Sequence, residues 1–221
     1  MLMGLCVASN VQANSLLGGL ASKLTETATN QPSQPIDINS YIAKAKATNL
    51  MFTQSRTALA TLFAERQDAE EIKIKRDLLN KTSDLKEKDA IQKDITKLTN
   101  SVLTANQKDE AAMVEKIQNF DARKKQLLVE SMTNFVIAGL SARELVTSSK
   151  QVSTQLLTNP MSLSNSGLSL VDAKGLIGDV SGIAKNSTMA LVQYPQLLKK
   201  AGVSFKVPDS ATTKPVELSD F

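Results

Sequence analysis

Apolar residues recur at steps of three and four along most of the chain, the spacing that places them on one face of an α-helix. The first such run covers residues 38–80 and contains neither proline nor glycine. Asp37 precedes it and can cap its first amides, while Ile36 and Tyr41 are spaced for a hydrophobic staple. The pattern predicts one helix over about 38–80, which would be about 65 Å long at 1.5 Å per residue.

A turn-like cluster at residues 80–84 separates this run from a second one, and Ser83 is placed to cap it. The second run extends over about 84–157, with Gly139 as its single glycine. We predict a second very long helix that packs antiparallel on the first as a coiled-coil hairpin. The reversal gives three apolar pairs, Phe52 with Met113, Leu62 with Leu103 and Ile72 with Ile95.

The later part of the chain is poorer in charge. Residues 131–142 carry none, so we expect this stretch of the second helix to be surrounded on several sides. Ser169 and Asp172 resemble a capping box and predict a third helix over about 169–201. Residues 203–221 should form an extended or disordered tail.

The predicted third helix contains several glycines, which cost helix propensity and which we interpret as positions of close backbone approach. Folding the chain back would place Gly182 opposite Leu140 and Ile183 opposite Gly139. The fold class expected from these patterns is all-α: an elongated antiparallel helical hairpin or coiled-coil bundle with very long helices and a shorter third helix packed on its base.

The N-terminal residues predict export. Residues 1–13 are mostly apolar and end in Val-Gln-Ala, which partly fits a signal-peptide cleavage site. No basic residue precedes Lys23, so we expect the true start of the signal peptide to lie upstream of Met1. Residues 14–36 form a Leu/Gly segment and a polar linker. Its leucines either pack on the folded body or mark an attachment point near a membrane or partner.

The amino-acid composition excludes several kinds of functional site. The chain has no histidine, and its one cysteine, Cys6, would leave with the signal peptide. Internal disulfides, cysteine or histidine metal sites and every triad that needs an imidazole are then excluded from the mature chain. The carboxylate pairs at residues 70–71 and 109–110 are adjacent on a helix and point apart. We therefore predict no enzyme and no catalytic, cofactor-binding or metal site.

The charges argue against nucleic acid and against a membrane span. The net charge is +4, but basic and acidic residues alternate through residues 65–125 as on a solvated helix face. A basic stripe with stacking aromatics, as single-stranded nucleic acid requires, is not found. No segment after the leader supplies the roughly 20 apolar residues of a membrane span.

The Leu-Leu-Gly-Gly-Leu run at 16–20, the ending at 194–200 and Val207-Pro208-Asp209, together with long charged helices, resemble uncharacterised exported helical proteins of Gram-negative bacteria. This resemblance implies a periplasmic or secreted location in a bacterium and transfers no functional residue. We expect a non-enzymatic binding or scaffolding protein of the cell envelope, chaperone-like in one version, with a protein partner; self-association stays open. The main alternative is a membrane-active protein of the helical pore-forming type that releases residues 132–142 into lipid.

Overall fold

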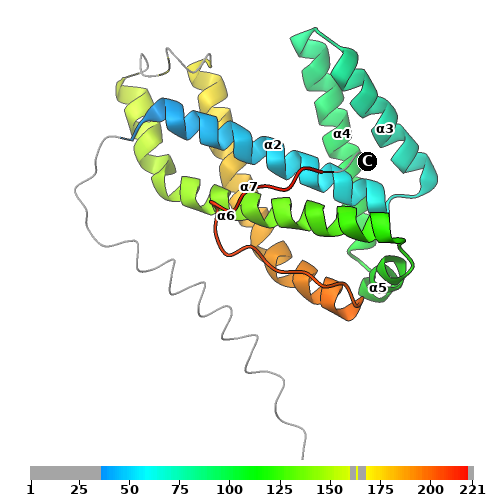
Figure 1. Ribbon diagram of the computed structural model, residues 1–221. Helices are drawn as coiled ribbons and strands as arrows, with labels where there is room; N and C mark the ends of the chain where they lie inside the picture. The colour runs from blue at the N-terminus through cyan, green and yellow to red at the C-terminus, as the bar shows by residue number, and fades with distance from the viewer. Residues whose placement is uncertain (1–35, 160–162, 164–167, 219–221) are drawn as a thin grey trace, which may run out of the picture. The chain divides into compact units, whose positions relative to one another are not determined.

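The computed structural model describes residues 36–159, 163 and 168–218. These residues form six helices and no strand (Figure 1). The helices are α2 (Ile38–Phe63), α3 (Arg66–Lys81), α4 (Leu85–Asn106), α5 (Glu110–Gln118), α6 (Ala122–Thr158) and α7 (Leu170–Lys200). The all-α prediction is confirmed. The predicted signal peptide at 1–13 and the Leu/Gly segment and linker up to residue 35 lie outside the described residues.

The core lies where α2, α6 and α7 pack on one another, and the α3–α4 hairpin joins it mainly through α2 (Figure 1). Three aromatic rings connect the core helices. Phe135 of α6 has its ring centroid 5.1 Å from that of Phe52 on α2 and 6.0 Å from that of Tyr194 on α7. Phe52, which we had paired with Met113 on the sequence pattern, thus packs against α6.

The prediction of one helix over 38–80 is wrong, because the chain leaves the helical conformation at Ala64 and Glu65. Both residues are extended, with ψ of 151° and 159°. The carbonyl of Phe63 at the end of α2 accepts hydrogen bonds from Lys116 Nζ at 2.7 Å and Asn106 Nδ2 at 3.3 Å. Side chains distant in sequence therefore satisfy the end of α2, and α3 takes a new direction from it.

The predicted helix over 84–157 is also wrong, because it is three helices. Asp109 caps α5 by accepting from the amide of Ala112 at 2.9 Å, and Asp121 caps α6 by accepting from that of Lys124 at 2.8 Å. Aspartate is a favoured N-cap residue, so each break is encoded locally. α6 itself continues through Gly139 without interruption.

Two of the three helix caps predicted from the sequence are confirmed, and the third is shifted by one residue. Asp37 caps α2 as predicted, accepting from the amide of Asn39 at 3.0 Å. The capping box of Ser169 and Asp172 is also confirmed at the start of α7. The cap of α4 is Asp84 rather than Ser83, with Oδ1 accepting from the amide of Glu87 at 2.8 Å. At these three helices the capping pattern thus predicts the start to within one residue.

The interpretation of the α7 glycines is wrong at three positions. A Cβ atom added at Gly175, Gly178 or Gly182 would meet no atom within 4 Å. These glycines therefore permit no closer helix approach than alanine would. Gly202 differs, since its φ of 74° lies in the left-handed region that ends helices. After it, residues 203–218, here called the C-terminal segment, return across the bundle without helix or strand (Figure 1).

Candidate functional site

A groove of about 700 Å³ lies between α2, the α3–α4 hairpin and the C-terminal segment, and is here called the hairpin groove. Its apolar lining comes from Leu50 and Met51 of α2, Leu79 of α3 and Ile95 of α4. Leu50 is 59% exposed and so presents apolar surface to the groove. The groove exists because α3 diverges from α2 at the break after Phe63, so the sequence feature that creates it is the extended pair at 64–65.

Residues 215–218 form one wall of the groove, and most of the remaining lining residues are polar or charged. Gln54 and Thr57 of α2 and Gln92 of α4 contribute neutral donors and acceptors. Arg76 and Glu217 add one charge of each sign. The groove thus offers apolar surface together with many hydrogen-bonding groups.

Asn134 of α6 holds the C-terminal segment in place at one wall of the groove. Its side-chain Oδ1 accepts from the amide of Val216 at 2.8 Å, and its Nδ2 donates to the carbonyl of Val216 at 2.6 Å. Asn134 itself is only 5% exposed. A single buried amide therefore satisfies both backbone groups of one residue, as a neighbouring strand would.

The connection between α2 and the α3–α4 hairpin, here called the hinge, lies at the C-terminal end of α2. Lys116 of α5 contacts this end through the carbonyl of Phe63, and its Nζ lies 3.8 Å from a carboxylate oxygen of Glu65. A cation at a helix C-terminus is favourable because the terminal carbonyls carry partial negative charge. Lys116 thus helps to fix the direction in which α3 departs and so the width of the hairpin groove.

The adjacent carboxylates noted in the sequence do not work as pairs. Glu70 binds Arg66 at 2.9 Å and Glu71 lies 3.6 Å from Lys75, each within α3. Asp109 caps α5, and Glu110 pairs with Lys200 of α7. Within residues 36–159, 163 and 168–218, no three acidic or cysteine side chains gather as a metal site would require.

Groups with shifted pKa values are dispersed over the bundle. Burial raises the pKa of Tyr41, whose hydroxyl donates to the carbonyl of Leu145 at 3.3 Å, and burial also raises the pKa of Asp179. Desolvation lowers the pKa of Arg56, which lies 5.4 Å from the ring centroid of Phe52. Each shift has a structural cause at its own position.

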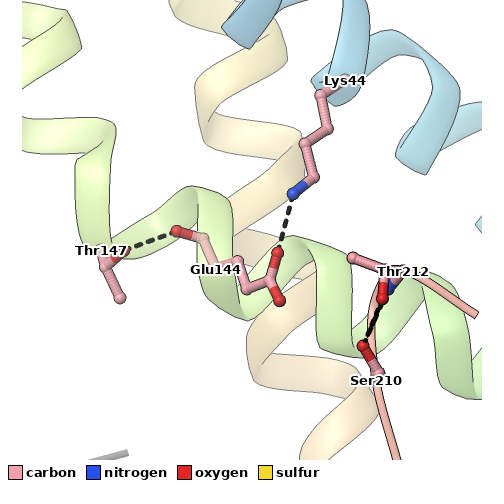
Figure 2. A network of polar contacts seen from close by, with 5 residues as sticks. All are labelled: Lys44, Glu144, Thr147, Ser210 and Thr212. Carbon is pink, nitrogen blue, oxygen red and sulfur yellow. Dashed lines mark hydrogen bonds and ion pairs between the residues drawn. The ribbon is translucent and has the colours of Figure 1, made fainter. Parts of the chain in front are cut away.

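Surface polar contacts join α2 to α6. Figure 2 shows Lys44 of α2 reaching Glu144 of α6 at 2.7 Å, while Thr147 donates to the Glu144 carbonyl at 2.6 Å. Ser210 and Thr212 of the C-terminal segment hydrogen-bond to each other nearby (Figure 2). Because the Lys44 and Glu144 side chains are about half exposed, their ion pair contributes little stability.

Asn134 was not singled out by the sequence analysis, although a signal for it existed. It lies in the uncharged run 131–142, which is buried as expected. A polar amide in such a run must find a hydrogen-bonding partner, because an unsatisfied buried amide is costly. The identity of that partner, 82 residues away, cannot be read from local pattern.

No described helix has the length and apolar character needed to cross a bilayer. No protein-family model, no curated protein and no solved structure matches this chain. The fold defines the class, an all-α helical bundle, and the α3–α4 hairpin with its groove is the feature on which a functional proposal depends.

Proposed function

We propose that this protein is a non-enzymatic binding or scaffolding protein of the bacterial cell envelope, periplasmic or secreted, that acts on a protein partner through its helical surfaces. The location rests on the leader-like residues 1–13 and on the resemblance to exported helical proteins. The observation that carries the binding role is the α3–α4 hairpin. Few of its side chains are buried, and several large apolar ones are exposed.

Exposed apolar side chains are found on two surfaces of the molecule, one on each side of α3. Ile74 and Leu78 are 66% and 45% exposed and lie one helical turn apart, on the face away from the buried Ile72. On the other side is the hairpin groove with the exposed Leu50. Large apolar side chains that remain in water next to a groove are typical of protein interaction sites. A chaperone-like grip on other exported proteins is the version that uses both surfaces.

The membrane-active alternative finds less support. It requires residues 132–142 to leave the bundle, yet Met132, Ile137 and Ala142 are almost completely buried. Phe135 in the same run contacts aromatic rings of both α2 and α7. Exposing these residues would dismantle the core. Release of dye from liposomes by the purified protein would favour this alternative over the binding role.

Site-specific photo-crosslinking in intact cells tests the proposal. A photoreactive amino acid at residue 74 or 78 should give discrete adducts with an envelope protein. The matched control is residue 93 in the same hairpin, where the Lys93 side chain is 75% exposed but belongs to a charged face. Equal adduct patterns from all three positions, or fractionation of the protein with the cytoplasm, would contradict the proposal.

A further inference from the structure

We infer that the position beside the hairpin groove at which Asn134 binds the backbone of Val216 is a binding site for an extended segment of polypeptide, and that residues 215–218, which form one wall of the groove, fill this position as an internal ligand. The inference rests on the proposed protein-binding function and names its ligand class. It goes beyond that function in assigning the recognition atom, the geometry of the ligand and the competitor already in place.

Backbone recognition is the first support. Asn134 gives its amide donor and acceptor to the carbonyl and the N–H of the same residue, Val216, at 2.6 and 2.8 Å. Backbone groups are the same in every non-proline residue, so this contact sets the position of an extended chain without selecting its side chain. Strand-like peptide recognition uses this division, with backbone hydrogen bonds for affinity and side-chain sites for selectivity.

The side chains of residues 215–218 indicate the ligand pattern. Leu218 is partly buried against the core, and Val216, two residues earlier, is 40% exposed. Side chains two residues apart lie on the same side of an extended chain. Pro215 needs no partner for its nitrogen, which has no hydrogen. The expected ligand is an extended segment with apolar residues two positions apart and a non-proline residue at the Asn134 contact.

Apolar surface beside the internal ligand remains open to a competing segment. Val216 remains well exposed, and Leu50 is still open to solvent in the same groove. The segment owes its occupancy to being tethered, since a short flexible connection gives an effective concentration on the order of millimolar. A partner segment with larger apolar side chains could cover Leu50 as well and so compete with the tethered one.

The test uses the full chain and a fluorescent peptide with the sequence of residues 210–218, Ser-Ala-Thr-Thr-Lys-Pro-Val-Glu-Leu. Val216→Pro in the protein removes the N–H that Asn134 accepts and weakens the internal ligand. We expect this variant to bind the peptide roughly fivefold more tightly than the unmodified protein, the effect of one lost hydrogen bond on the competitor. The control Val216→Ala keeps the N–H and should change peptide affinity less.

A change in the peptide alone removes any concern about folding of the variants. N-methylation of the valine in the peptide should reduce its affinity for the Val216→Pro protein at least roughly fivefold. Asn134→Ala added to Val216→Pro should abolish the gain in affinity, with circular dichroism confirming the helical fold. Absence of peptide binding to the Val216→Pro protein, or equal binding of the N-methylated peptide, would overturn the inference.

The outcomes separate this inference from the proposed function. If the peptide fails to bind while crosslinks from residues 74 and 78 persist, the groove assignment is wrong and the envelope-binding role stands. If the peptide binds as expected but no envelope partner is captured, the peptide site stands and the proposed role is wrong.

Discussion

The α2–α6–α7 core and the α3–α4 hairpin are both helical, yet they are stabilised differently. In the core, α6 is buried along most of residues 131–142, and aromatic rings of three helices meet at Phe135. In α3 the only buried side chain is Ile72. Few buried contacts therefore stabilise α3, whereas many stabilise α6. Helices in proteins owe most of their stability to such packing.

The surface of the hairpin adds little to this difference. The ion pair of Lys75 and Asp94 at 3.1 Å links α3 to α4. Asp94 raises the pKa of Lys75 through its hydrogen bond. Exposed ion pairs contribute little, so the buried side chains of the hairpin, such as Ile72, Ile91 and Ile95, and its connection to α2 decide whether the hairpin stays folded.

The largest effect is expected in the core. Phe135→Ala removes the ring that contacts both α2 and α7 and should lower the free energy of unfolding by about 3–5 kcal/mol. Chemical denaturation followed by circular dichroism measures the loss. Leu157→Ala, at a position 63% exposed in the same helix, is the control and should leave the transition nearly unchanged. A small effect of Phe135→Ala would show that the aromatic contacts are not the centre of the core.

The next effect separates the two regions. Ile72→Ala should cost about 2–4 kcal/mol, because Ile72 is the one buried side chain of α3, is completely buried and belongs to the hydrophobic core. Hydrogen exchange should rise in α3 and α4 while α6 keeps its protection, since regions of low contact density open separately. Exposed Ile74 in the same helix supplies the control Ile74→Ala. Uniform loss of protection across all helices would mean that hairpin and core unfold as one unit.

The sequence reveals helix starts better than helix continuity. Asp37 and Ser169 were recognised as caps, but Asp109 and Asp121 were not, because apolar spacing continues across both breaks. A capping residue inside a periodic run is therefore a stronger signal of a helix boundary than the period is of continuity. The all-α class and the buried run 131–142 followed from pattern alone.

The break after Phe63 could not be predicted in the same way. The residues there, Ala64 and Glu65, both favour helix, and neither is glycine or proline. The hydrogen bonds that satisfy the end of α2 come from Asn106 and Lys116, which are 43 and 53 residues away. The hairpin groove depends on this break, so it too was beyond local pattern. Tertiary contacts overrode propensity at the position that matters most for the site.

A mutation at the hinge is expected to lower the free energy of unfolding less than the loss of either buried side chain. Lys116→Met keeps the apolar part of the side chain and removes the ammonium that binds the Phe63 carbonyl. We expect a loss of about 1–2 kcal/mol, because the hydrogen bond is charge-assisted but the lysine is one-third exposed. Hydrogen exchange should increase at the start of α3. Lys125→Met, which removes a bond to the carbonyl of Gln118, is the control and should leave α3 unaffected.

The smallest expected effect is a gain in stability rather than a loss, and it comes from a substitution in α7, one of the core helices. Gly178 is exposed in α7, and a Cβ atom there would meet no neighbour within 4 Å. Gly178→Ala should therefore stabilise the protein by about 0.5–1 kcal/mol, since alanine restricts the unfolded chain and favours helix. Gly202→Ala is the opposing control, because its φ of 74° strains any residue with a side chain. Thermal unfolding compares the two. A loss of stability in Gly178→Ala would mean that another surface, such as that of a partner or a second copy, packs closely against this glycine.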